Sequence, residues 1–463
     1  MDFYLISVLI FIAIIALILF KDRKNVERQL IFFIRKTQHG KSTIIRIGES
    51  FPRFWKVVST IGVIVGFFMS IYIVFLLVSL LVEAVITSYL PGPALSFLLP
   101  VPSTEVIQVP GLILIPFWYF IISIALLVVV HEGLHGIIAA SEKIGLKSLG
   151  WGLLAIIPVA FVEPDEKQMA KKPAISQLRV FAAGSFANFI LAFLCLFIIS
   201  FGLVSMTTST GVGYSYVAEG YPAEMANMTG KIISIDGFEI HNSNDLAQAL
   251  INSGPNQTVT VTTVSGDGDE SEFIIKTSQK PPPQYSPTFV DDLVAGIDTA
   301  LPGTVEFSKS FGDGLSSIGG SQYSERDSLM IDIQYWQYLS ENYPHLEERA
   351  ESHIEEIEME LQETPESGYL GILNVYDVRE ARSQFLAFES LIFVLIDLLS
   401  FVALINFGVG AFNLLPIYAL DGGRMWHILL LRFAPKRAKP VTKILTYITL
   451  LIIASIFIIQ FLF

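Results

Sequence analysis

A His-Glu-x-x-His sequence at residues 131–135 places metal-binding side chains inside an apolar run, residues 112–140. Two histidines four residues apart on a helix lie on one face, about 6 Å apart along its axis, so one Zn²⁺ can bind both imidazoles. Glu132 then lies beside the metal, where its carboxylate can take a proton from a zinc-bound water. A charged group near the centre of a membrane helix costs about 2.5–3.5 kcal/mol on insertion scales. The run therefore predicts metal chemistry inside a bilayer.

The composition predicts a polytopic α-helical membrane protein. The chain has 463 residues, of which 52% are hydrophobic, and a mean hydropathy of +0.58. Apolar stretches long enough to cross a hydrocarbon core of about 30 Å give six expected spans. These are residues 3–20, 57–82, 112–140, 179–206, 386–415 and 441–463.

Basic residues mark the loops expected in the cytoplasm. Ten Lys and Arg lie in residues 21–56, five in 143–172 and six in 424–443, whereas residues 89–111 have none. Cytoplasmic loops carry an excess of Lys and Arg. We therefore expect an integral membrane protein with both termini outside. A prokaryotic cell membrane is its expected location.

The segment between the fourth and fifth spans is acidic and is expected outside the cell. Residues 207–384 hold 29 acidic and 8 basic side chains, although the whole chain has a net charge of only −13. Such a surface excludes nucleic-acid binding, which needs a basic face. The acidic residues are explained most simply as keeping an external domain soluble.

A second polar motif lies in the fifth span, where Asn413 and Pro416 precede Asp421, Gly422 and Gly423. A catalytic zinc needs a third protein ligand, and the single cysteine, Cys195, rules out a thiolate cluster. The third and fifth spans both run inward. His131, about 28 Å along its helix from residue 112, and Asp421 are therefore expected at similar depth toward the cytoplasm.

Together the two motifs resemble the site-2 protease family of intramembrane zinc metalloproteases. The resemblance rests on His131-Glu-x-x-His135 and Asn413-x-x-Pro416-x-x-x-Leu420-Asp421-Gly422. It extends to Gly-Ser-Phe-Ala-Asn at 184–188, to Phe-Val-Glu-Pro-Asp-Glu at 161–166 and to a PDZ-like pattern at 217–237. It implies that His131, His135 and Asp421 bind one Zn²⁺ per chain and that Glu132 is the general base. Asn413 would contact the substrate carbonyl or the developing oxyanion.

The resemblance implies a metalloendopeptidase that cleaves within or near the transmembrane helix of a membrane protein in the bilayer, toward the cytoplasmic side. The PDZ-like domain would either bind a peptide of the substrate or exclude bulky substrates by size. One alternative is a membrane zinc-binding or transport protein without proteolysis. Another is a scaffold with an inactive site, which the presence of all three ligands and Glu132 disfavours.

The expected organisation has six parts: an N-terminal span and basic loop (1–56), a first core half (57–206), a PDZ-like α+β domain (211–280), an acidic insertion (281–384), a second core half (385–440) and a C-terminal span (441–463). Residues 149–162 are expected to form a re-entrant hairpin with a strand edge beside the zinc.

Three further polar residues in the spans leave alternatives open. Asn188 could hydrogen-bond near the site or let helices pack closely, and Asn406 could extend the polar stripe of Asn413 or be packed. Asp397 lies too far from Asp421 to be a ligand and could belong to a buried pair or an external gate.

Overall fold

The computed structural model describes residues 3–23, 26–29, 32–87, 95–109, 111–154, 157–283, 289–299 and 325–460, and also residues 285, 287, 302, 305, 306 and 309. Parts of the loop at 89–111, the tip of the hairpin at 149–162 and much of the insertion at 281–384 lie outside the described residues. The chain divides into two compact units, one of residues 1–203 and 390–463, the other of residues 204–389.

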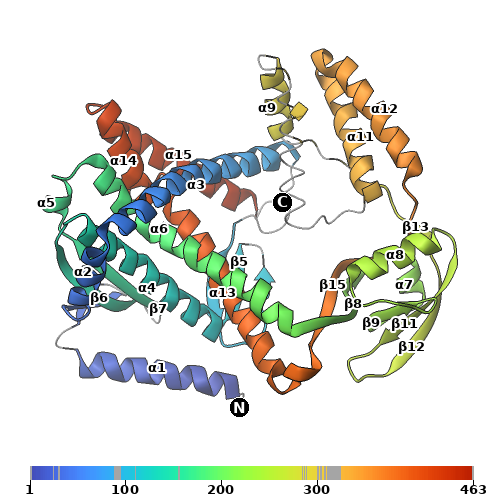
Figure 1. Cartoon of the computed structure of the whole chain (residues 1–463), viewed down its shortest axis with the longest axis horizontal. Coiled ribbons are helices and arrows are strands. Elements are labelled where there is room, and N and C mark those ends of the chain that lie inside the picture. The colour runs from blue at the N-terminus through green and yellow to red at the C-terminus, as the bar shows by residue number, and fades with distance from the viewer. Residues whose placement is uncertain are drawn as a thin grey trace. The chain divides into compact units, whose positions relative to one another are not determined.

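The first unit is helical, and six of its described helices are long and apolar enough to cross a membrane (Figure 1). They are α1 (Phe3–Lys21), α3 (Pro52–Thr87), α4 (Phe117–Ser141), α6 (Ala174–Phe197), α13 (Glu389–Asn413) and α15 (Ala438–Ile459). Three shorter helices are α2 (Lys41–Ser50), α5 (Glu166–Met169) and α14 (Asp421–Phe433). The expected polytopic helical class with six spans is confirmed.

Two spans have bounds that differ from those expected. Residues Leu112–Pro116 form strand β5, so α4 begins only at Phe117. β5 pairs with β3 (Phe97–Val101) and β4 (Ile107–Val109). His131 is therefore about 21 Å along its helix, not 28 Å. The fifth span ends at Asn413, because Pro416 has no N–H to donate and disfavours a helical residue before it.

The expected hairpin is present and belongs to a larger sheet. β6 (Leu146–Leu154) and β7 (Ile157–Pro164) pair antiparallel. β6 also pairs with β2 (Phe32–Thr37), which pairs with β1 (Glu27–Gln29). The residue pattern of the basic loop did not predict these two strands. In the order β1-β2-β6-β7, β7 keeps one free edge.

Helix α6 packs closely against α4 because its facing residues are small. Ala182, Ala183, Gly184 and Ala187 are all buried on α6. Small side chains let two membrane helices approach and gain van der Waals contact, which replaces the hydrophobic effect as the driving force in lipid. The close packing brings the backbone of α6 directly against the histidines of α4.

The second unit contains a β-sheet of order β12-β11-β9-β8-β15, with β10 paired to β9. Its strands are β8 (Thr207–Val217), β9 (Lys231–Ile235), β10 (Phe238–Glu239), β11 (Thr258–Val264), β12 (Glu270–Lys276) and β15 (Ile372–Ala381). Alternate residues such as Val259 and Val261 are buried on one face, as expected for strands with one side in a core. Two helices, α7 (Pro222–Met225) and α8 (Ser243–Ser253), contribute Ala223, Leu246 and Ala249 to this core.

The sheet continues beyond residue 280, the predicted boundary of the PDZ-like domain. β15 pairs along β8, and Leu370 and Ile372 complete the core. A short pair, β13 (Ser278–Gln279) and β14 (Gly368–Tyr369), joins the two ends of the insertion. The insertion itself includes α9 (Phe289–Asp298), α11 (Glu325–Asn342) and α12 (Glu347–Glu363), packed around Trp336, Leu339 and Leu346.

Candidate metal centre and active site

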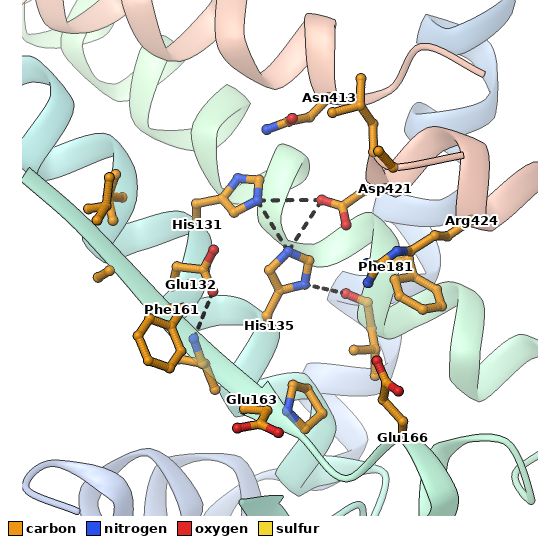
Figure 2. Close-up of a pocket in the computed structure, with 18 of the residues that line it drawn as sticks. His131, Glu132, His135, Phe161, Glu163, Glu166, Phe181, Asn413, Asp421 and Arg424 are labelled. Atoms are coloured by element: carbon orange, nitrogen blue, oxygen red, sulfur yellow. Dashed lines mark hydrogen bonds and ion pairs between the residues drawn. The ribbon is translucent and has the colours of Figure 1, made fainter. Parts of the chain in front are cut away.

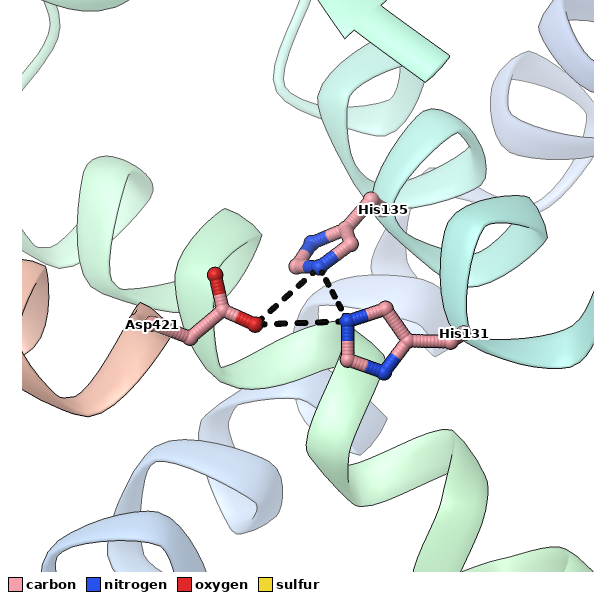
Figure 3. Close-up of side chains that lie close together, drawn as sticks. All are labelled: His131, His135 and Asp421. Atoms are coloured by element: carbon pink, nitrogen blue, oxygen red, sulfur yellow. Dashed lines mark hydrogen bonds and ion pairs between the residues drawn. The ribbon is translucent and has the colours of Figure 1, made fainter. Parts of the chain in front are cut away.

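Helix α4 presents the first two candidate ligands. His131 and His135 lie one turn apart, both are buried, and their Nε2 atoms are 3.2 Å from each other (Figure 3). The spacing of four residues on an unbroken helix brings the two rings together, as the sequence predicted.

Asp421 completes the cluster from the first turn of α14. Its Oδ2 lies 3.4 Å from His131 Nε2 and 3.3 Å from His135 Nε2. The two glycines that follow allow the loop after α13 to fold over this turn. A Cβ on Gly422 would stand 2.0 Å from the Leu414 carbonyl oxygen, and one on Gly423 would stand 2.0 Å from that of Ile417. The two glycines of the Asp-Gly-Gly sequence are therefore required by backbone packing at the site.

The three side chains fit a zinc ion. Donor atoms bound at about 2.0–2.1 Å in a tetrahedron lie about 3.3 Å apart, which matches the observed separations. Among the described residues, a group of side chains that could hold a metal ion is formed by His131, His135 and Asp421, whose donor atoms all lie within 4.8 Å of one another. Room for an ion exists because residue 184 is glycine: a Cβ there would lie 2.5 Å from His131 Nε2 and 2.3 Å from His135 Nε2.

Glu132 is held at the free edge of the sheet. Its Oε2 accepts a hydrogen bond of 2.9 Å from the Val162 N–H of β7. Val162 lies opposite Leu149 in the β6–β7 ladder, but its N–H points to Glu132, so this residue presents its backbone groups to the free edge. The expected strand edge beside the candidate metal ligands is therefore present in the structure.

A cavity of about 560 Å³ joins these groups. His131, Glu132 and Asp421 line it together with Asn413, and residues 159–164 of β7 form one wall (Figure 2). Asn413 is the last residue of α13, is half-buried, and makes no hydrogen bond through its side chain in the described part of the chain. Its amide is therefore available to a ligand.

The structure also places three polar residues that lie outside the His131, His135 and Asp421 cluster. Asp397 is exposed on α13, which ends before Asp421. The buried Asn406 donates to the Val402 carbonyl, 2.8 Å away on its own helix, which favours the packed role. His427 contacts Thr442 of α15 at 3.1 Å and is not part of the metal cluster.

Several contacts around the site were not predicted from the sequence. The Val180 carbonyl lies 2.6 Å from His135 Nδ1, and a backbone oxygen leaves no signal in residue types. Arg424, one turn after Asp421, lines the cavity and places its guanidinium over the Phe181 ring at 5.5 Å. Arg424 follows Asp421 by three residues, and this helical spacing could have indicated that Arg424 lines the same cavity.

One cavity carboxylate outside the membrane spans has a shifted pKa. Hydrogen bonds from the Ser148 hydroxyl and the Lys147 ammonium hold the pKa of Glu163 below its ordinary value. Glu163 therefore stays ionised at neutral pH and is unsuited to donating a proton.

This fold and site define a polytopic helical membrane protein with a His-His-Asp cluster that could hold a metal ion. The chain matches peptidase family M50 over residues 119–456 and belongs to this family, as the resemblance to site-2 proteases implied.

Three relatives are similar over part of their length. The chain is 27% identical over 213 residues to the membrane-bound transcription factor site-2 protease homolog of Arabidopsis thaliana, covering 44% of this chain and 40% of that protein. It is 31% identical over 251 residues to an uncharacterized protein of Methanocaldococcus jannaschii, covering 52% and 62%. It is 24% identical over 267 residues to a protein of Fusobacterium nucleatum named as a candidate zinc metalloprotease, covering 57% and 66%. The chain thus spans less than two thirds of the length of each.

Proposed function

We propose that this protein is a zinc metalloendopeptidase that hydrolyses a peptide bond within or near the transmembrane helix of a membrane-protein substrate. The observation that carries the proposal is the convergence of three ligand atoms with Glu132 and a free strand edge in one cavity. Membership of peptidase family M50 supports the reaction class.

His131, His135 and Asp421 would hold the zinc. When bound, zinc supplies a Lewis acid that lowers the pKa of water to about 7 and polarises a carbonyl. Glu132 accepts the proton of the attacking water and passes it to the amine that leaves. General acid–base catalysis of this kind contributes about 10²–10⁴-fold. The Val162 N–H orients the Glu132 carboxylate for this transfer.

Asn413 is proposed to donate its amide N–H to the oxyanion that forms from the scissile carbonyl. It lines the cavity with the ligands, and its side chain has no hydrogen bond that competes in the described structure. One donor of this kind is worth about 2.7–4 kcal/mol in acyl-transfer enzymes.

The free edge of β7 is proposed to bind the substrate backbone. A transmembrane helix satisfies its N–H and C=O groups internally, so it must unwind before a carbonyl reaches the site. Pairing with a strand edge replaces the lost hydrogen bonds. Ala160 and Val162 share this edge because they are two residues apart on an antiparallel strand.

The second unit is proposed to contain a PDZ-like domain, formed by residues 207–280 with β14 and β15, that filters substrates. The domain would either bind a peptide of the substrate as an added strand at the free edge of β15 or exclude bulky substrates by its size. β15 is the last strand of its sheet, and the Ser243 N–H at the start of α8 donates to the Asp377 carboxylate of β15 at 2.7 Å. This bond ties the helix to the strand beside the free edge.

The distribution of Lys and Arg supports the proposed orientation in a prokaryotic cell membrane. Both termini and the second unit would lie outside, and the metal site would lie toward the cytoplasm. Residues 143–172, which contain the hairpin, hold five basic side chains.

The test is cleavage of a fluorescently tagged single-span substrate by purified protein. We expect Glu132→Gln to keep its zinc and to lose about 10²–10⁴-fold in rate, because only the proton acceptor is removed. Chelation should abolish wild-type cleavage, and added zinc should restore it. Glu49→Gln, on the exposed face of α2, is the matched control.

Equal cleavage by Glu132→Gln and wild type would remove Glu132 from its role. Zinc binding by the wild type without cleavage of any single-span substrate would favour a metal-binding or transport protein.

A further inference from the structure

Asn188 of α6 lies against a metal ligand and not only in a helix interface. Its side chain is fully buried, with 0% of its surface exposed, and its Nδ2 is 3.1 Å from His131 Nδ1. Its Oδ1 is also buried and has no hydrogen-bond partner among the described residues. A buried amide oxygen without a partner costs free energy, and this one belongs to an amide that faces a candidate metal ligand.

A second state of this amide follows from the chemistry of the histidine. The Nε2 atoms of His131 and His135 both point at Asp421, so a metal would bind through Nε2. A neutral imidazole bound through Nε2 carries its proton on Nδ1, which then needs an acceptor. For His135 that acceptor is the Val180 carbonyl at 2.6 Å. For His131 the group that faces Nδ1 is the Asn188 amide.

We propose that Asn188 is a positioning residue that selects the metal-binding tautomer of His131. In the structure, the Nδ2 end of the amide faces Nδ1. With metal, Nδ1 is protonated, and the amide turns about its last torsion so that Oδ1 accepts the Nδ1–H. The two ends of an amide are nearly equal in size, so this turn needs little change in the packing of Gly410 against the Asn188 Cβ.

The spacing on α6 supports this role. Val180, Gly184 and Asn188 follow one another at intervals of four residues and therefore lie in one stripe on the helix. Val180 orients His135, Gly184 leaves room at the Nε2 atoms, and Asn188 meets His131. One face of α6 thus supports both histidines of α4.

The test measures metal affinity, not peptidase rate. It compares Asn188→Leu, which keeps the volume and removes the acceptor, with Asn188→Asp, which keeps an acceptor oxygen. The matched control is Asn406→Leu. Asn406 is equally buried, and its Oδ1 also has no partner among the described residues, but its amide donates to Val402 of its own helix. Zn²⁺ affinity is obtained by competition with a chelator, and the visible spectrum of Co²⁺-loaded protein reports the ligand geometry.

We expect Asn188→Leu to bind Zn²⁺ about 10- to 100-fold more weakly and to alter the Co²⁺ spectrum, as loss of an outer hydrogen bond to a ligand does. Asn188→Asp should recover most of the affinity, and Asn406→Leu should match the wild type. If Asn188→Leu does not fold, Asn188→Ala, which adds no volume, takes its place with the same expected loss.

Wild-type Zn²⁺ affinity in the variant without the acceptor overturns the inference. Equal losses in Asn188→Leu and Asn406→Leu also overturn it, since they indicate packing alone. The inference rests on the zinc site of the proposed function but not on the reaction. A protein that binds zinc and cleaves nothing would refute the peptidase and leave the affinity series intact.

Discussion

At the scale of single residues, the site depends as much on missing side chains as on ligands. Gly184, Gly422 and Gly423 each occupy a place where a Cβ would collide with a ligand ring or with backbone. None of the three has a positive φ, so the requirement is space and not backbone conformation. Close approach of α6 and of the loop before α14 therefore determines whether the ligand atoms can converge.

Replacing Gly184 with alanine tests this requirement. The new Cβ would lie 2.5 Å or less from both Nε2 atoms, so we expect zinc binding to be lost and the free energy of unfolding to fall by about 1–3 kcal/mol. The control is Gly133→Ala in the motif itself, where a Cβ meets nothing within 4 Å. That variant should keep its zinc affinity. Metal content of the purified proteins and their thermal unfolding decide the outcome; full metal occupancy in Gly184→Ala contradicts the expectation.

At the scale of elements, strand β7 links the sheet to the candidate metal site. The Val162 N–H of β7 donates a hydrogen bond to the Glu132 carboxylate. Residues 159–164 of the same strand line the cavity. The basic loop before α2 supplies β2, which pairs with β6, so the hairpin is part of a four-stranded sheet and not an isolated loop. A hairpin alone is only marginally stable, and the added strands fix the position of the edge.

The substitution Ala160→Pro tests the role of this edge. Proline is tolerated on an edge strand where its missing N–H faces outward, so the sheet should form. If the substrate pairs here, one backbone hydrogen bond is lost, worth about 0.5–1.5 kcal/mol, and cleavage should fall about 2- to 10-fold. Zinc affinity should not change. Ala160→Ser keeps the N–H and is the control; equal cleavage by the proline and serine variants would argue against substrate pairing at Ala160.

At the scale of the whole molecule, the site is assembled from two halves of the chain. Asp421 follows His135 by 286 residues, and the second unit is inserted between them. The membrane helps the two distant segments to meet. A helix that crosses the hydrocarbon core can shift little along the membrane normal, so the depth of each site residue is nearly fixed.

Cysteine labelling tests the proposed topology. Cys195 is the only cysteine and is buried, so a Cys195→Ser background permits single cysteines at positions 167 and 265. In sealed membranes, an impermeant thiol reagent added from outside should label position 265 and not position 167 until the membrane is opened. The alternation of basic loops is the physical reason. Labelling of both positions from the same side would refute the proposed orientation.

The sequence by itself determined the helical class, the six spans, the ligand residues as candidates and the hairpin. These follow from periodicity, span length and motif spacing, which are local properties. The start of α4 at Phe117 was missed because Leu112–Pro116 is as apolar as a membrane helix, and only pairing with β3 and β4 makes it a strand. Likewise, β15 pairs with β8 although a long insertion separates the two strands, and residue patterns do not predict pairing between segments so far apart in the sequence.

Only the tertiary structure decided how the motifs meet. The distances among His131, His135 and Asp421, the Val162 bond to Glu132, and the support of both imidazoles by α6 arise between distant segments. Packing of three helices sets these distances, and packing depends on the shapes of facing side chains and not on the pattern within any one helix.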